Sequence, residues 1–207
     1  MSDMNDDGRF SVSGWEDDLN DIDTDRNPTE ERQKQILEAA EKGDLETIKA
    51  LLNEDKTLIS TVDKDKYTPL HRACYSNHLE VVKYLVEQGA DISAKTDMLW
   101  EPLHSCCQWN NVKCAAYLIQ CGANVNATSE GGQTPLHIAA AHGACYDTVQ
   151  LLLMHPYINT KLKNNSGETA AEIARRSSKY YNIFESVEPL LDYTNIELLK
   201  KGDNPDN

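Results

Sequence analysis

Histidine and cysteine are the side chains of this sequence best suited to metal binding and catalysis, and both recur at regular spacing. His71, His104 and His137 are 33 residues apart. Three imidazoles in register could bind a metal ion or serve as general bases. Each ends the same short motif, Thr-Pro-Leu-His in two copies and Glu-Pro-Leu-His in the other. Because a 33-residue step places them on successive structural units, we predict that each one hydrogen-bonds its own unit to the next.

The cysteines could indicate a disulfide framework or a zinc site. Cys106, however, stands where a neighbouring copy of the motif has Ala73. Cys107, Cys114 and Cys121 recur every seven residues, which crosses two expected helices and a turn and matches no compact zinc spacing. We therefore predict reduced core residues and no metal ligand. The residues concerned are Cys74, Cys106, Cys107, Cys114, Cys121 and Cys145.

Motifs for catalysis are absent from the sequence. There is no nucleophile elbow, no phosphate-binding glycine loop and no His-Glu-x-x-His zinc motif. We therefore expect no catalytic residue, no cofactor and no enzymatic activity.

The motif that carries the histidines also organises the chain. TPLHRA at 68–73 recurs as EPLHSC at 101–106 and TPLHIA at 134–139, and fades into TAAEIA at 169–174. The steps are 33, 33 and 35 residues. This period and motif resemble the ankyrin-repeat family, in which a β-turn and two antiparallel helices form each repeat. The resemblance implies an all-α repeat solenoid of about five units with degenerate caps, which binds other macromolecules.

The chain divides into a repeat domain at 27–190 and two tails. NPTE at 27–30 has the order of a helix capping box, so we expect a helix that starts there and ends near Gly43. The first unit reads KQIL at 34–37 in place of the motif, as expected of a terminal cap that faces water. We predict a disordered acidic tail (1–26), a first cap (about 27–60), repeats at about 63–95, 96–128 and 129–163, a C-terminal cap (164–190) and a second tail (191–207).

Local signals within the repeats are mostly regular. We expect Thr68 to cap a helix with its hydroxyl and Pro69 to occupy its first turn. The glycine between the helices is replaced by Asn110, which tolerates the left-handed conformation. Leu99 replaces the usual loop glycine, and this puts the hairpin shape of that repeat in doubt.

The positions that vary between repeats are the candidates for partner binding, because loop tips and the exposed side of each first helix line a concave face. Aromatic residues gather at these positions, and aromatics are enriched among binding hot spots. The alternative is that the rings pack on each other and stiffen a glycine-poor hairpin. The candidate residues are Tyr67, Tyr75, Met98, Trp100, Gln108, Trp109, Gln133 and His142.

The net charge of −14 is concentrated near the N-terminus, where residues 1–31 hold 11 Asp or Glu against two Arg. Such a balance disfavours direct nucleic-acid binding and favours basic protein partners. Phe10, Trp15 and Leu19 are apolar anchors in this acidic tail, which either binds a partner groove or only solubilises the chain. The sequence has no membrane-span signal and no signal peptide, so we expect an intracellular protein of the nucleus or cytoplasm.

Together these features predict a monomeric interaction module that binds a protein partner on its concave face in a regulatory role, transcriptional or signalling. The alternative is an inhibitor that masks a basic segment of its partner with the acidic tail and the groove. The family resemblance also implies that Asn126 could be hydroxylated, against the simpler role of stabilising its turn. Arg175, Arg176 and Lys179 form a small basic cluster, read here as the charged face of the cap.

Overall fold

The structure is a computed structural model that describes residues 30–143 and 145–185. The predictions for the tails, including the anchors Phe10, Trp15 and Leu19, lie outside the described residues. The labelled helices of the described residues are α1 (Glu31–Lys42), α2 (Leu45–Glu54), η1 (Lys56–Ser60, a 3₁₀-helix), α3 (Pro69–Tyr75), α4 (Leu79–Glu87), α5 (Pro102–Gln108), α6 (Val112–Gln120), α7 (Pro135–Ala141), α8 (Tyr146–Leu153) and α9 (Ala170–Ser177). Residues 182–185 are also helical.

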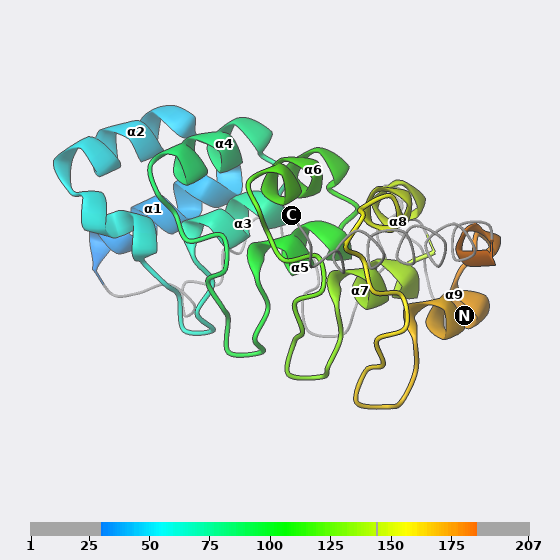
Figure 1. The fold of residues 1–207 in the computed structure, drawn as a ribbon. Coiled ribbons are helices and arrows are strands. Elements are labelled where there is room, and N and C mark those ends of the chain that lie inside the picture. The colour runs from blue at the N-terminus through cyan, green and yellow to red at the C-terminus, as the bar shows by residue number, and fades with distance from the viewer. Residues whose placement is uncertain (1–29, 144, 186–207) are drawn as a thin grey trace, which may run out of the picture.

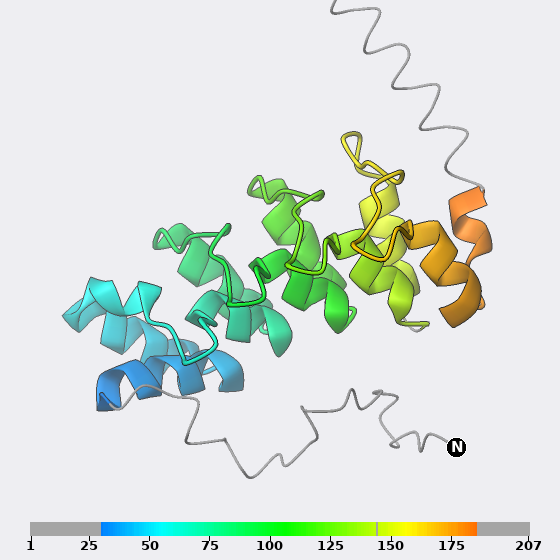
Figure 2. The ribbon, with the colours of Figure 1, turned by 90° about the horizontal axis from the view of Figure 1, so that it is seen from below.

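The helices pair in sequence and stack in two layers (Figure 1). The inner layer contains α1, α3, α5, α7 and α9, each in contact with the next, and the outer layer contains α2, α4, α6 and α8. Figure 2 shows the pairs following one another as a single row. The predicted all-α repeat solenoid is confirmed, and the described β-structure is limited to one isolated bridge, Lys163 to Thr169. Within the described residues, no helix combines the length and apolarity needed to cross a membrane.

The inner helices begin where the repeated motif predicts. In α3, Thr68 has extended backbone angles and its Oγ1 accepts a hydrogen bond from the His71 N–H at 3.3 Å. Pro69 occupies the first helical position, where no backbone N–H is required. Thr134 caps α7 in the same way. The motif therefore acts as a helix start signal in each copy.

The start of α1 differs from the prediction. The helix begins at Glu31 after Glu30, which has the extended angles of an N-cap residue, whereas the prediction placed the start at 27–30. Glu30 makes no side-chain capping bond, so the capping box expected of NPTE does not define the described helix end. The predicted end is confirmed, because Gly43 adopts φ 76° and its N–H bonds to the Ala39 carbonyl.

Four hairpin loops precede the inner helices α3, α5, α7 and α9. Each has a left-handed residue at the equivalent position, namely Lys66, Leu99, Gly132 or Gly167. Leu99 has φ 58°, and its N–H donates to the Thr96 carbonyl at 2.9 Å as the Gly132 N–H does to that of Ser129. The hairpin shape that Leu99 put in doubt is therefore retained, with a bulky residue in a conformation that suits glycine.

Replacing Leu99 with glycine is expected to raise the free energy of unfolding by about 0.5–1 kcal/mol, because the left-handed strain exceeds the entropy that glycine adds to the unfolded chain. Little burial is lost, since Leu99 is 43% exposed. Urea unfolding measures the change. The matched control is Met98→Gly at the neighbouring exposed position, where φ is not positive and glycine should destabilise. A loss of stability in L99G equal to that in M98G would contradict the prediction.

The core lies between the layers and continues from one repeat to the next. Five of the cysteines are buried, as predicted: Cys74, Cys106, Cys107, Cys114 and Cys145. The prediction was wrong for Cys121, which is exposed. It caps the C-terminus of α6, one residue beyond the amphipathic pattern of that helix, and so points away from the core.

Candidate functional site

The motif histidines stabilise the repeat array through hydrogen bonds to backbone carbonyls. The Nδ1 of His71 accepts the Thr68 N–H at 3.3 Å, and its Nε2–H donates to the Trp100 carbonyl of the next repeat at 3.0 Å. A carbonyl oxygen only accepts, so the ring is neutral with its proton on Nε2. Protonation of His71 at Nδ1 would place its new N–H directly opposite the Thr68 N–H, and the two donors would repel each other. Burial accordingly lowers the pKa of His71 to about 4.

The other two motif histidines repeat this arrangement. The Nε2 of His104 donates to the Ala127 carbonyl at 3.2 Å, and that of His137 donates to the Glu168 carbonyl at 3.1 Å. Burial lowers the pKa of His104 to about 4 and lowers that of His137. The predicted role, linking each repeat to the next, is confirmed for His71 and His137, whereas the Ala127 carbonyl belongs to the same repeat as His104. All three rings are occupied by backbone partners rather than presented to a ligand.

Four of the buried cysteine thiols have low reactivity. Burial raises the pKa of Cys114 to about 12 and of Cys145 to about 11, and raises those of Cys74 and Cys107 further above the usual range. Thiolate is the form that binds metals and attacks electrophiles, so these cysteines pack as small apolar residues. Among the described residues, no group of three histidine, cysteine or acidic side chains is arranged to hold a metal ion.

The candidate aromatic residues lie on adjacent inner helices and the hairpins before them. Tyr75 at the end of α3 and Trp109 after α5 meet edge to face, with ring centroids 5.0 Å apart. Trp100 stacks on His104 at 6.1 Å and 27°. Each of the three rings is half-buried, so one part is held by neighbours and another part is open to a partner. Trp100 precedes α5, whereas Trp109 follows it, so the two tryptophans lie at opposite ends of that helix. We call Tyr75 and Trp109, whose rings are in contact, the aromatic cluster.

The remaining candidates differ in their exposure. Met98, at the tip of the second hairpin, is 57% exposed. Tyr67 is half-buried with its ring 5.6 Å from that of His71. Gln108 and Gln133 are half-buried in the third and fourth repeats.

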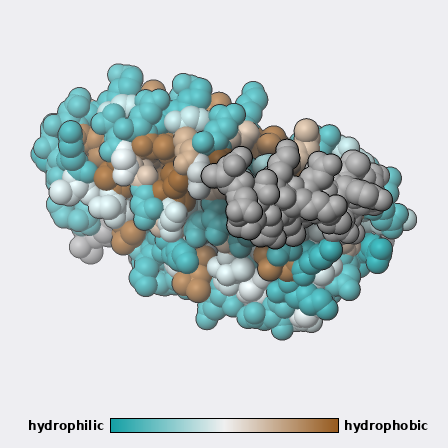
Figure 3. All heavy atoms as spheres, in the orientation of Figure 1, coloured by the Kyte–Doolittle hydropathy of each residue, from teal (hydrophilic) through white to brown (hydrophobic). Residues whose placement is uncertain are grey.

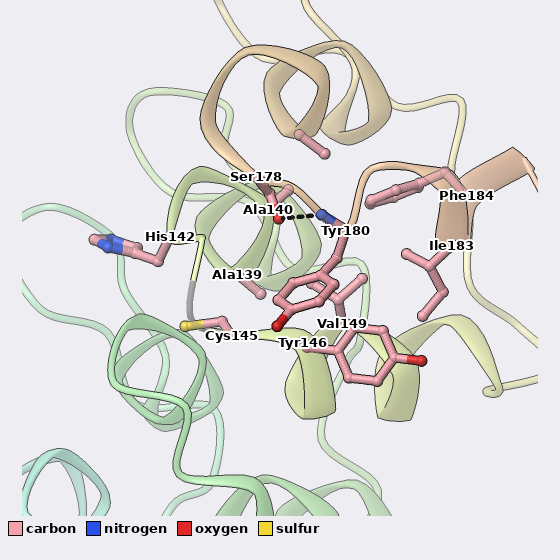
Figure 4. Close-up of a pocket in the computed structure, with 11 residues that line it drawn as sticks. Ala139, Ala140, His142, Cys145, Tyr146, Val149, Ser178, Tyr180, Ile183 and Phe184 are labelled. Atoms are coloured by element: carbon pink, nitrogen blue, oxygen red, sulfur yellow. Dashed lines mark hydrogen bonds between the residues drawn. The ribbon is translucent and has the colours of Figure 1, made fainter. Parts of the chain in front are cut away.

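His142 is separate from the aromatic cluster. It follows α7 and borders a small cavity between α7, α8 and the last repeat, and Figure 4 shows its ring directed away from Tyr146 and Tyr180. Burial lowers the pKa of His142. Among the candidates, the structure therefore brings Tyr75 and Trp109 into contact and leaves His142 at a different junction.

Two residues that support the cluster were not singled out from the sequence. The Nδ2 of Asn111 donates to the carbonyls of Cys74 and Tyr75 at 2.7 and 2.8 Å, which ties the end of α3 to the next repeat. Arg72, 11% exposed, forms ion pairs with Glu41 and with Asp63, the latter at 2.8 Å. The available signal for Asn111 was its alignment with His78, whose Nε2 donates to the Glu41 carbonyl at 2.9 Å.

Both the nitrogen and the oxygen of the Asn126 side-chain amide form hydrogen bonds. Its Nδ2 donates to the Tyr157 carbonyl at 2.7 Å, and its Oδ1 accepts the Asn159 N–H at 2.9 Å. These bonds cross from one repeat to the next loop and support the turn-stabilising role rather than a free amide awaiting modification.

Hydrophobic surface on the face seen in Figure 3 is divided into separate patches by hydrophilic side chains. Scattered apolar residues of this kind are ordinary on a protein surface.

The stacked helix pairs, the capped motif and the bonded hairpins define an ankyrin-repeat array. The chain matches the family described as "Ankyrin repeats (3 copies)" over residues 19–96, 36–129 and 103–201, and it belongs to the ankyrin-repeat family. Such repeats generally serve as protein-interaction modules, and proteins of the family are generally not enzymes.

Among curated proteins, the chain is similar to "Ankyrin repeat domain-containing protein 49". The protein of that name from Homo sapiens is 62% identical over 153 residues, which is 74% of this chain and 64% of the human protein. The one from Drosophila melanogaster is 48% identical over 182 residues, 87% of this chain and 85% of that protein. The match spans slightly under two-thirds of the length of the human relative, and 65% of the one from Bos taurus.

Proposed function

We propose that this protein is a non-enzymatic regulatory adaptor of the nucleus or cytoplasm that captures a protein partner on its concave face, with the aromatic cluster as the anchor. The observation that carries the proposal is the edge-to-face contact of Tyr75 and Trp109 from neighbouring repeats, each half-buried. Aromatic rings held rigid before binding lose little entropy on association, which is typical of hot spots.

The surroundings of the cluster support the same proposal. Met98 exposes 57% of its surface at the hairpin tip beside Trp100 and offers a flexible apolar contact. Gln108 and Gln133 offer amide groups that suit the backbone of an extended segment. Cysteines that are free rather than paired in disulfides fit a reducing compartment.

Alanine at both Trp100 and Trp109 is expected to weaken partner binding by about 100-fold or more, because each hot-spot aromatic contributes about 2 kcal/mol or more. A pull-down with the wild-type chain identifies the partner, and titration calorimetry then compares the variants. Tyr157→Ala is the matched control, since Tyr157 is 72% exposed on a loop remote from the cluster. Unchanged affinity together with a lowered melting temperature would show that the tryptophans only stiffen the scaffold.

The second candidate is an inhibitor that masks a basic segment of its partner with the acidic tail and the groove. The acidic character of residues 1–31, which hold 11 Asp or Glu and only two Arg, favours this second candidate. A shortened chain that begins at Asn27 separates the two functions. Loss of binding and of its salt dependence in that chain supports masking, whereas retained binding supports capture by the repeats alone.

A further inference from the structure

Two arginines and a lysine surround one serine at the end of the last described inner helix. Arg175 and Arg176 lie in the last turn of α9, Ser178 is its C-cap residue, and Lys179 follows. The side chains of Arg175 and Arg176 are 61% and 60% exposed. The order Arg-Arg-x-Ser, with the serine two positions after the pair, is the pattern that basophilic protein kinases read in their substrates.

The two serines at this end of α9 have different roles. The hydroxyl of Ser177 donates to the Ala140 carbonyl at 3.0 Å and is close to that of Ile173 at 2.7 Å, so it joins two repeats. The Oγ of Ser178 instead accepts the Tyr180 N–H at 3.1 Å. In that bond Ser178 is the acceptor, so its hydroxyl proton takes no part in joining the two repeats. The backbone of Ser178 is extended, with φ −130° and ψ 137°.

The ion pairs of the two arginines at this helix end are weak. Arg176 pairs with Glu168, and Arg175 with Glu185 at 3.5 Å, in exposed pairs of a kind that contribute about 0–1 kcal/mol. Ser178 also borders the small cavity of Figure 4, which has room for about one water molecule. Helix ends of a repeat array with few neighbours open at low free-energy cost. Local opening of the last turn of α9 presents the arginines and the serine as an extended segment.

We propose that Ser178 is a phosphorylation site for a basophilic serine kinase. The Oγ of Ser178 attacks the γ-phosphorus of magnesium ATP, and the bond from that phosphorus to the β–γ bridging oxygen breaks. ADP leaves, and the hydroxyl proton passes to the catalytic base of the kinase. Acidic groups of the kinase bind Arg175 and Arg176 through charge-assisted hydrogen bonds.

Phosphorylation loosens the last repeat. The phosphate adds a charge of about −2 at the C-terminal end of α9, where the helix dipole is already negative. It also competes with Glu168 and Glu185 for the arginines. Because the cavity beside Ser178 is too small for a phosphate, the group displaces Tyr180 from its ring contact with Tyr146, now at 5.0 Å.

The test incubates the full-length chain with magnesium ATP and the catalytic subunit of cAMP-dependent protein kinase as the probe. Intact-mass spectrometry is expected to show one added phosphate, and peptide mapping is expected to place it on Ser178. Ser177→Ala is expected to remain a substrate, and S178A is not. Arg175→Gln combined with Arg176→Gln should slow labelling by about tenfold or more, because charge-assisted contacts to the kinase are lost.

Hydrogen exchange then measures the consequence in the phosphorylated chain. Amides of residues 170–185 are expected to exchange about tenfold faster than in the unmodified chain, while those of α3 and α5 keep their rates. Absence of phosphate from Ser178, or equal labelling of S178A, overturns the site. Unchanged exchange over 170–185 after full labelling overturns the loosening.

Discussion

Acidification from about pH 7 to about pH 4 is expected to unfold the repeat domain, because two buried histidines must then take up protons. The pKa values of His71 and His104 are about 4 in the folded chain and near 6.5 when unfolded. The folded pKa lies below the unfolded value, so the stabilisation is complete above about pH 6.5 and is lost as the pH falls toward 4. The loss is on the order of 3 kcal/mol for each ring, comparable in sum with the whole stability of a small domain.

Urea unfolding at a series of pH values measures the number of protons taken up. His104→Gln should be less stable at neutral pH but should take up about one proton fewer on acid unfolding. Asn53→Ala, at an exposed position on α2, is the control because it changes no titratable group. Burial raises the pKa of the Glu101 carboxyl, so its protonation stabilises the folded chain in acid and partly offsets the loss. An acid transition with the same proton number in wild type and H104Q would contradict the assignment.

Asn111→Ala is expected to lower the free energy of unfolding by about 2–4 kcal/mol, because it leaves two carbonyls at the end of α3 without their donors. Asn111 is 7% exposed and donates to the carbonyls of Cys74 and Tyr75. Water cannot readily replace an amide at so buried a position. The effect should extend to partner binding, since Tyr75 would no longer be held beside Trp109.

Two variants make this prediction specific. Asn111→His should recover part of the stability, because His78 at the equivalent position of the preceding repeat donates its Nε2–H to the Glu41 carbonyl. Asn53→Ala, at an exposed position on α2, should change the stability by less than about 0.5 kcal/mol. Chemical unfolding of the three variants decides the matter, and a similar small effect at Asn53 and Asn111 would rule out a structural role for the Asn111 amide.

The fold was predictable from the sequence because each repeat carries its own local start signals at a constant period. Thr68 and Pro69 start a helix through contacts within four residues, and His71 follows in the same motif. Asn110 was also predictable, since a left-handed residue between two helices needs only a residue type that tolerates φ 57°. In these cases the deciding interaction lies within one repeat or recurs at every repeat.

Less of the candidate site was predictable, because the hydrogen bonds and ion pairs that stabilise it join two repeats and occur at only one junction each. The bonds of Asn111 reach residues 36 and 37 positions away, and no second copy of this asparagine signals them. The pairing of Arg72 with Glu41 and Asp63 likewise occurs at one junction only among the described residues. The sequence grouped His142 with the aromatic positions by register, whereas the structure places it beside the small cavity at the last junction.

The acceptors that His71 and His137 reach in the next repeat are backbone carbonyls that belong to a tryptophan and a glutamate. Every residue has such a carbonyl, so the joint between two units makes no demand on the side chain that it meets. At this joint, a change of side chain in the neighbouring unit therefore needs no compensating change in the histidine. The joint remains constant while the residues beside it are free to diversify toward new partners.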